Sequence, residues 1–223
     1  MIKAILFDLD GTLLDRDTSI QNFISNQYER LKSQLNKIPK KDYIKRFIEL
    51  DCRGYVWKDK VYQSLVSEFE ISTITWKELL SDYNRQFIYS CTPFPNLHQT
   101  LDTLLIQGYL LGIITNGLGV FQKRAIQGLG INRYFQTILI SEVEGVRKPD
   151  VEIFMRASHN LNVTPYESVF IGDHPEVDIL GASNAGMKSI WKRNSGWHEA
   201  QHADGIIDDL GEIPLLIKNI IRI

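Results

Sequence analysis

The chain has 223 residues, of which 43% are hydrophobic and 23% charged, a composition typical of a folded globular protein and not of a disordered or fibrous one. Its 25 lysines and arginines nearly balance its 27 aspartates and glutamates, which argues against a nucleic-acid or anionic-membrane binder. The N-terminal segment reaches Asp8 too early for a signal peptide, and no apolar run is long enough to span a membrane, so a cytoplasmic protein is expected. Cys52 and Cys91 lack CxxC spacing and are expected to be reduced and inert.

The first predicted element is a short strand. Residues 2–7 form an apolar run that ends in Asp8-Leu9-Asp10-Gly11, a pattern typical of a buried strand followed by a polar turn. In residues 16–90, apolar side chains recur every three or four positions, and no strand is predicted there. This stretch carries 13 basic and 10 acidic side chains, whereas the rest of the chain carries 12 basic and 17 acidic ones. Pro93-Phe94-Pro95 then ends the helical pattern.

Strands and helices alternate after Pro95. Apolar runs predict strands at 109–115, 137–141, 168–172 and 187–191, and helical patterns lie at 97–105, 119–129, 151–161 and 176–185. This alternation predicts a parallel, doubly wound sheet of the Rossmann-like type, which binds ligands at the carboxyl ends of its strands. We therefore expect an α/β core domain of residues 1–15 and 93–223 that carries an all-helical domain of residues 16–92.

Polar and charged side chains gather where these strands end. They comprise carboxylates, a hydroxyl, an amide and a lysine, and they are Asp8, Asp10, Thr115, Asn116, Lys148, Asp173 and Asp178. Because the carboxyl ends of parallel strands meet at one edge of a sheet, we expect these side chains to lie together. Two carboxylates two residues apart and a distant third suit Mg²⁺, which takes a few oxygen ligands and completes its shell with water and substrate phosphate. Lys148 and Thr115 would then bind the remaining phosphate oxygens.

Four motifs occur in order along the chain. They are Asp8-Leu9-Asp10-Gly11-Thr12-Leu13-Leu14-Asp15, Ile114-Thr115-Asn116-Gly117, Arg147-Lys148-Pro149-Asp150 and Gly172-Asp173-His174-Pro175-Glu176-Val177-Asp178. With these motifs, the whole sequence resembles the haloacid dehalogenase-like superfamily of aspartate-nucleophile hydrolases. Members of that superfamily with helices inserted after the first motif use them as a mobile cap, so the resemblance implies that residues 16–92 are a cap domain.

The resemblance also implies a role for each motif residue. Asp8 would attack phosphorus to form an aspartyl-phosphate, and Asp10 would protonate the leaving oxygen and later deprotonate the hydrolytic water. The Mg²⁺ ligands would be the Asp8 carboxylate, the Asp10 backbone carbonyl and Asp173, with Asp178 at the edge of the site. The phosphoryl group would be bound by Thr115, the Asn116 backbone and Lys148.

These observations favour a Mg²⁺-dependent phosphatase that acts on a small phosphomonoester. Phosphomutases and dehalogenases are the alternatives within the superfamily, but its dehalogenases carry no acid/base carboxylate two residues after the nucleophile, and Asp10 is present here. A non-catalytic phosphate-binding protein is the alternative from another class. The intact set of Asp8, Asp10, Lys148 and Asp173 argues against it. Neither a nucleic acid nor a membrane is an expected partner.

One pattern points to a different chemistry. His198-Glu199-Ala200-Gln201-His202 matches the H-E-x-x-H pattern of zinc metalloproteases, in which two histidines one helical turn apart bind zinc. That motif needs a long helix and a third ligand. Because Gly196 lies just before the pattern and Gly205 just after it, we interpret the match as chance and expect two surface histidines on a short turn.

A non-periodic stretch of the helical region is a candidate for substrate recognition. It contains a glycine, two aromatic and two cationic side chains and reads Asp51-Cys52-Arg53-Gly54-Tyr55-Val56-Trp57-Lys58. We expect Arg53 and Trp57 to bind the leaving group, because the positive charge of this region suits an anionic substrate. The aromatic rings suit a leaving group with a ring, such as a nucleoside or a flavin. The alternative is that Trp57 packs within the helical domain and Arg53 is solvated.

Overall fold

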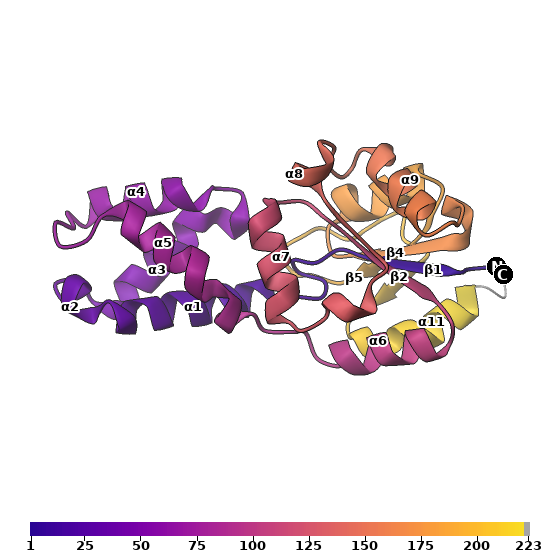
Figure 1. Cartoon of the computed structure of the whole chain (residues 1–223), viewed down its shortest axis with the longest axis horizontal. Coiled ribbons are helices and arrows are strands. Elements are labelled where there is room, and N and C mark those ends of the chain that lie inside the picture. Colours follow the sequence, from indigo (N-terminus) through magenta and orange to yellow (C-terminus); the bar gives the residue numbers. More distant parts are fainter. Residues whose placement is uncertain (221–223) are drawn as a thin grey trace. The chain divides into compact units, whose positions relative to one another are not determined.

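The computed structural model describes residues 1–220 of the chain (Figure 1). The chain divides into two compact units, one comprising Met1–Asp15 and Pro93–Ile223 and the other comprising Arg16–Thr92. The two segments of the first unit meet at a β-bridge between Leu14 and Pro93, so both connections to the second unit start from one place. No helix among residues 1–220 combines the length and the apolar character that crossing a bilayer requires.

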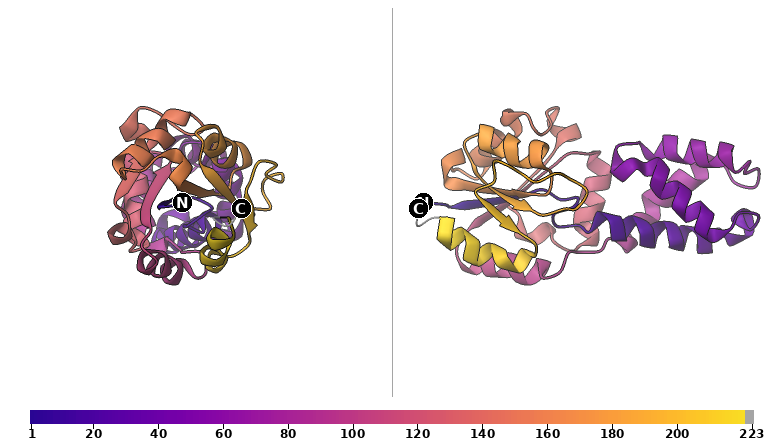
Figure 2. Two further views of the ribbon diagram at one scale, coloured as in Figure 1. Left: turned by 90° about the vertical axis from the view of Figure 1, so that its right-hand side faces the viewer. Right: turned by 180° about the vertical axis from the view of Figure 1, so that it is seen from behind.

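A six-stranded sheet, in which every neighbouring pair is parallel, is the centre of the first unit (Figures 1 and 2). Its order is β3-β2-β1-β4-β5-β6. The strands are β1 (Ala4–Phe7), β2 (Leu110–Thr115), β3 (Thr137–Ile140), β4 (Ser168–Gly172), β5 (Lys188–Lys192) and β6 (Gly205–Ile207). The predicted doubly wound parallel sheet is confirmed. Strand β6 was not predicted, because three residues are too few to show a periodic pattern.

Helices cover both faces of the sheet. They are α6 (Leu97–Ile106), α7 (Gly119–Gly128), α8 (Ser141–Glu144), α9 (Val151–Asn160), α10 (Gly181–Asn184) and α11 (Ile213–Ile220). Helices α6 and α11 lie side by side on one face and α9 lies on the other, as the two opposite views in Figures 1 and 2 show. Under α9, the rings of Phe154 and Phe170 meet edge to face at 5.1 Å and form part of a core that includes Leu6 and Ile114. Strand β1 is therefore buried between helical layers, which explains its uninterrupted apolar sequence.

Short helical segments complete the first unit. Three are 3₁₀ turns, η3 (Asn132–Tyr134), η4 (Pro165–Glu167) and η6 (Leu210–Glu212). The predicted helix at 176–185 is instead a π-helical turn, η5 (Pro175–Leu180), followed by α10. The sequence pattern does not distinguish these forms, since a π-helical turn of six residues is too short to show a period different from that of an α-helix.

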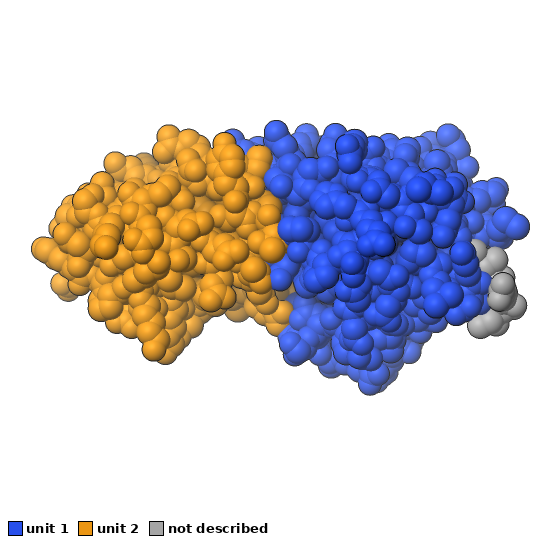
Figure 3. Space-filling model, turned by 90° about the horizontal axis from the view of Figure 1, so that it is seen from below, with its two compact units in different colours: residues 1–15, 93–223 blue, residues 16–92 orange. Residues whose placement is uncertain are grey.

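The second unit comprises residues 16–92, all of which the structure describes (Figure 3, orange). These residues contain no strand. Its elements are α1 (Arg16–Arg30), α2 (Lys32–Leu35), α3 (Lys40–Asp51), η1 (Cys52–Gly54), α4 (Lys58–Glu68), α5 (Trp76–Gln86) and η2 (Phe87–Ser90). Phe23, Tyr83 and Phe87 form an aromatic cluster, with Phe23 4.9 Å from Tyr83 and Tyr83 stacked on Phe87 at 5.1 Å. Apolar faces of α1, α5 and η2 thus meet in the core that their periodicity predicts.

A buried polar residue connects four helices of the second unit. Gln27 of α1 is fully buried, and its Oε1 accepts hydrogen bonds from Tyr62 Oη at 2.9 Å and Tyr43 Oη at 3.3 Å. Its Nε2 donates to Leu79 O and to Asp82 Oδ2, both at 3.0 Å. Because every polar atom of the Gln27 amide has a partner, the network fixes how α1, α3, α4 and α5 pack.

Replacing Gln27 by leucine should destabilise the protein by about 2–4 kcal/mol, because the phenolic hydroxyls of Tyr43 and Tyr62 would stay buried without their hydrogen-bond acceptor. The measurement is urea-induced unfolding followed by circular dichroism. Gln21 lies on the exposed side of the same helix, so Gln21→Leu is the matched control and should change the free energy of unfolding by less than about 0.5 kcal/mol. Equal effects of the two substitutions would show that the network contributes nothing.

Candidate active site

The carboxyl edge of the sheet brings the predicted site residues together. Phe7 lies opposite Ile113 of β2 and Ile171 of β4, so the residues that follow these three strands emerge side by side. Asp8 continues this register, because its backbone N–H donates to Ile171 O at 2.8 Å. The seven residues predicted from the strand ends contact one another or share a neighbour through their side chains, and all lie in the first unit.

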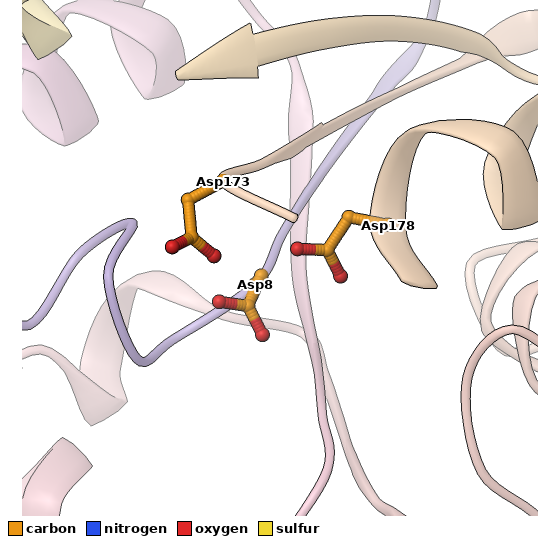
Figure 4. A group of neighbouring side chains, drawn as sticks. All are labelled: Asp8, Asp173 and Asp178. Atoms are coloured by element: carbon orange, nitrogen blue, oxygen red, sulfur yellow. The ribbon is translucent and has the colours of Figure 1, made fainter. Parts of the chain in front are cut away.

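Three buried carboxylates form the centre of the site. Asp8, Asp173 and Asp178 each contribute one oxygen to a group whose members lie within 4.8 Å of one another (Figure 4). It is the one group of three or more possible metal ligands found in residues 1–220. Burial raises the pKa of Asp8 well above its usual range, although Lys148 opposes this. Burial and the nearby charge of Asp178 raise the pKa of Asp173 to about 6. Without a further cation, the site therefore resists full ionisation.

Lys148 is the buried cation of this cluster. Its side chain is 1% exposed, and Nζ lies 2.6 Å from Asp8 Oδ1 and 2.7 Å from Asp178 Oδ1. Burial would lower the pKa of Lys148, but Asp178 and Asp8 outweigh burial, and the pKa lies above its usual value. Lys148 is thus held as an ammonium group between two carboxylates.

Asn116 positions the segment that carries Lys148. Its Nδ2 donates to Lys148 O at 2.9 Å, and Lys148 N donates to Asn116 Oδ1 at 3.0 Å. This reciprocal pair ties the loop after β2 to the loop before α9. The side chain of Asn116 therefore has a structural task beside the phosphate-binding role expected of its backbone.

Asp173 is oriented by the loop between β5 and β6. Asn194 Nδ2 and Trp197 Nε1 donate to Asp173 Oδ2 at 2.7 and 3.1 Å, and Trp191 Nε1 donates to Asp173 O at 2.7 Å. Gly11 lies against the same carboxylate with φ +87°, and a Cβ at this position would lie 2.4 Å from Asp173 Oδ2. The glycine of the first motif therefore allows the first and fourth motifs to approach each other.

Three residues of the site were missed by the sequence analysis. Gln122 donates to Asp10 Oδ2 and to Thr115 Oγ1, and Asn194 and Trp197 donate to Asp173. For Gln122 a signal was available, because it lies in the first turn of the helix that follows the second motif, where side chains point back toward the strand ends. For Asn194 and Trp197 no signal was available, because they lie in an irregular loop.

In residues 1–220, the histidines at 198 and 202 and His174 of the fourth motif are not members of the group of possible metal ligands described above. Residues 193–204 contain no helix, and His198 and His202 are both exposed, so the H-E-x-x-H match lacks the helical geometry that zinc binding requires. His174 caps η5 instead, since its Nδ1 accepts from Glu176 N and Val177 N at 3.2 Å. Its ring packs at 4.3 Å on Trp197. The reading of the histidine pair as a chance match agrees with these observations.

The two residues predicted for substrate recognition lie in the second unit. Arg53 follows α3 in a left-handed conformation, with φ 54°, and its Nη2 lies 3.6 Å from Asp17 Oδ2. Trp57 precedes α4 and is 56% exposed. The segment is anchored by Asp51, which is buried and paired with Arg16 at 2.7 Å and with Lys58. Trp57 is thus not a core residue of the helical unit.

Comparison with known proteins gives a consistent picture. A family model described as haloacid dehalogenase-like hydrolase matches residues 5–192. The glyceraldehyde 3-phosphate phosphatase of Pyrococcus furiosus is 31% identical over 95% of this chain and 91% of its own. The crystal structure of a HAD phosphatase from Thermococcus onnurineus superposes with a TM-score of 0.68 at 28% identity, covering 97% of this chain and 98% of the other. The 2-haloacid dehalogenase of Pseudomonas syringae pv. Tomato DC3000 superposes with a TM-score of 0.67 at 26% identity, covering 98% and 99%.

The raised pKa of Asp173 predicts a dependence of stability on pH. The carboxyl group of Asp173 binds its proton more tightly in the folded protein than in the unfolded chain. The contribution of the protonated carboxyl to the free energy of unfolding is therefore lost as the pH rises through about 6. Asp173→Asn cannot ionise and should be more stable than the wild type by about 1–3 kcal/mol at pH 8 without metal, a difference that shrinks toward pH 4.

Urea unfolding in chelator at several pH values measures this difference. Asp102→Asn, at an exposed carboxylate of α6, is the control and should stay within about 0.5 kcal/mol of the wild type throughout. An Asp173→Asn variant that is less stable than the wild type at pH 8 would contradict the assignment.

Proposed function

The chain belongs to the haloacid dehalogenase-like hydrolase family and is a phosphatase of that family, and we propose that it cleaves a small phosphomonoester through an aspartyl-phosphate on Asp8. The observation that carries this mechanism is the buried contact of 2.6 Å between Lys148 Nζ and Asp8 Oδ1. A carboxylate and a phosphate dianion repel each other, so attack requires a cation that faces both. Lys148 is such a cation, and its own charge is maintained by Asp178.

We propose that the three carboxylates hold Mg²⁺. Their donor atoms are all oxygens, as this hard cation prefers, and the raised pKa values of Asp8 and Asp173 support a site that Lys148 alone does not neutralise. The ligands would be the carboxylates of Asp8 and Asp173 and the backbone carbonyl of Asp10, with Asp178 beside them. When bound, Mg²⁺ would neutralise charge between the nucleophile and the phosphoryl oxygens.

Asp10 would transfer the protons. In the first step an Asp8 oxygen bonds to phosphorus, the bond from phosphorus to the leaving oxygen breaks, and that oxygen takes the proton of Asp10. In the second step a water attacks phosphorus, its proton returns to Asp10, and Asp8 is released with inorganic phosphate. The presence of Asp10 is why we propose phosphate chemistry, although one structural neighbour is named a dehalogenase.

The phosphoryl group would be bound by Thr115, the Asn116 backbone and Lys148. Thr115 is 1% exposed and Lys148 2% exposed, so these contacts would be made largely out of water, where they are strongest.

The substrate would be a small phosphorylated metabolite. The similar Pyrococcus furiosus enzyme is named for glyceraldehyde 3-phosphate, a small phosphomonoester. We propose that the helical unit acts as a cap and that Arg53 and Trp57 recognise the leaving group. The exposed rings of Tyr55 and Trp57 support a leaving group with a ring, such as a nucleoside or a flavin.

Asp8→Asn should abolish both turnover and the phosphoenzyme, because the amide is not a nucleophile. Asp10→Asn should lower kcat by about 10²–10⁴-fold while Mg²⁺ binding persists, since only the backbone of residue 10 would contact the metal. Phosphate release from 4-nitrophenyl phosphate, the mass of the quenched intact protein and Mg²⁺ titration measure the three quantities.

The control for both variants is Asp102→Asn, which should retain full activity. Wild-type activity should vanish in chelator, return with Mg²⁺ or Mn²⁺ and be suppressed by Ca²⁺, whose larger and looser coordination shell would misplace the phosphate. Phosphorylation of a residue other than Asp8 would refute the mechanism, and full activity in chelator would refute the metal.

Arg53→Ala and Trp57→Ala should raise KM for the natural substrate by roughly 3- to 30-fold and leave hydrolysis of 4-nitrophenyl phosphate unchanged, because leaving-group contacts are separate from the phosphoryl chemistry. A screen of phosphorylated metabolites, including sugar phosphates, nucleotides and flavin mononucleotide, identifies that substrate. Tyr89→Ala removes another exposed ring, which lies in the same unit but outside residues 51–58, and is the control. A uniform loss on both substrates would mean that the loop supports the fold only.

A further inference from the structure

We propose that Gln122 is a positioning residue that aligns the proton-transferring carboxylate of Asp10 and the phosphate-binding hydroxyl of Thr115. This inference rests on the proposed function and adds a residue that none of the four motifs contains. Gln122 Nε2 lies 2.8 Å from Asp10 Oδ2 and 2.6 Å from Thr115 Oγ1, and the side chain is 6% exposed.

The chemistry of its neighbours fixes the orientation of this amide. Besides Asp10 and Thr115, Nε2 faces the backbone carbonyl of Asn116 at 3.4 Å. A carbonyl oxygen and a carboxylate only accept hydrogen bonds, so the NH₂ group of Gln122 must point toward them. Its two hydrogens are then used by the Asp10 carboxylate and the Thr115 hydroxyl.

For Asp10, the contact selects a conformation. Within residues 1–220, Gln122 is the hydrogen-bonding partner of the Asp10 side chain. A carboxylate rotates easily about its last torsion when nothing holds it. With Oδ2 held by Gln122, Oδ1 is the oxygen that exchanges the proton with the leaving group and the water, which requires placement within hydrogen-bond reach.

For Thr115, the contact directs a proton. The hydroxyl oxygen accepts from Gln122, so its own hydrogen points to another acceptor. In the proposed reaction that acceptor is a phosphoryl oxygen. One amide thus orients both the general acid/base Asp10 and the hydroxyl of Thr115, which would donate a hydrogen bond to the phosphoryl group. In the proposed reaction these two groups act on opposite ends of the breaking bond between phosphorus and the leaving oxygen.

The fold makes room for this side chain. Gly117 has φ +153°, and a Cβ there would lie 2.9 Å from Gln122 Cδ, so the glycine lets Gln122 pack back over the loop. The loop itself is held by two neighbours, because Gly117 N donates to Ser141 Oγ at 3.0 Å and Gly119 N to Glu142 Oε2 at 2.7 Å. The segment that carries Gln122 is therefore held in place by these hydrogen bonds.

Leaving-group dependence distinguishes a positioning role from a merely structural one. Nitrophenolate needs little protonation to leave, whereas an alkoxide needs a general acid. The value of kcat/KM covers substrate binding and the phosphorylation of Asp8 but not the later hydrolysis of the aspartyl-phosphate. Gln122→Met and Gln122→Leu remove the donors at similar volume, and they should lower kcat/KM for glycerol 3-phosphate by about 10- to 100-fold but for 4-nitrophenyl phosphate by only a few-fold. The inhibition constant of inorganic phosphate should rise about three- to tenfold, because Thr115 loses its orientation.

Gln136→Met is the matched control. Gln136 Oε1 accepts a hydrogen bond from Leu111 N at 2.7 Å, at the amino end of β2 and away from the site. This variant should therefore keep the wild-type ratio of the two kcat/KM values. The proposal for Asp10 would be overturned if the Gln122 variants lost kcat/KM equally on both phosphates or not at all, or if Gln136→Met changed the ratio of the two kcat/KM values. The proposal for Thr115 would be overturned if the inhibition constant of inorganic phosphate stayed unchanged in the Gln122 variants. A wild type without Mg²⁺-dependent activity would overturn the proposed function and this inference together, whereas an active wild type with unaffected Gln122 variants would overturn this inference alone.

Discussion

The buried ion pairs of Lys148 are the interaction on which the rest of the site depends. Its ammonium group lies between Asp8 and Asp178, with almost no exposed surface, at the edge of a sheet whose central strand is fully buried. Burying three carboxylates with one lysine is costly because charges lose their hydration. The raised pKa values of Asp8 and Asp173 are the visible sign of that cost. Under the proposed function, the same imbalance of charge would attract a divalent cation and, with it, a phosphate.

The site is organised in two shells. The groups that would contact the phosphate or the metal follow directly from the strand ends, where a rigid parallel sheet fixes their backbones. Around them, amide and indole groups from loops and a helix turn set the directions of the side chains. Asn116 clamps the backbone of Lys148, Gln122 bridges Asp10 and Thr115, and Asn194 holds Asp173. In each of these contacts a neutral side chain donates a hydrogen bond to an acceptor of the site. The contact therefore orients a charged residue without changing the net charge of the site.

Under the proposed function, the two units of the chain have different tasks, because one carries out the phosphoryl chemistry and the other recognises the substrate. The residues proposed for the phosphoryl chemistry all belong to the first unit, where they follow the ends of the strands. The second unit is held by an aromatic core, the buried network of Gln27 and ion pairs such as Arg16–Asp51, and it displays Arg53 and Trp57 on a short loop anchored by Asp51. Under the proposed function, changes in that loop would alter the substrate while the phosphoryl chemistry stays the same, in keeping with the rule that loops carry specificity and scaffolds carry geometry.

The sequence alone determined the parallel sheet, its edge and the residues on it, because apolar runs and the polar turns that end them are local features. Asp8 and Asp173 are 165 positions apart, yet each follows a buried strand, and the geometry of parallel strands brings them together. Only the tertiary structure revealed Gln122, Asn194 and Trp197, since their task depends on which oxygen each donor reaches and not on any pattern along the chain. It also revealed β6 and the π-helical form of η5, which are too short or too similar to other forms for periodicity to detect. Local sequence patterns thus specify where the site residues lie, and tertiary packing decides which further side chains orient them.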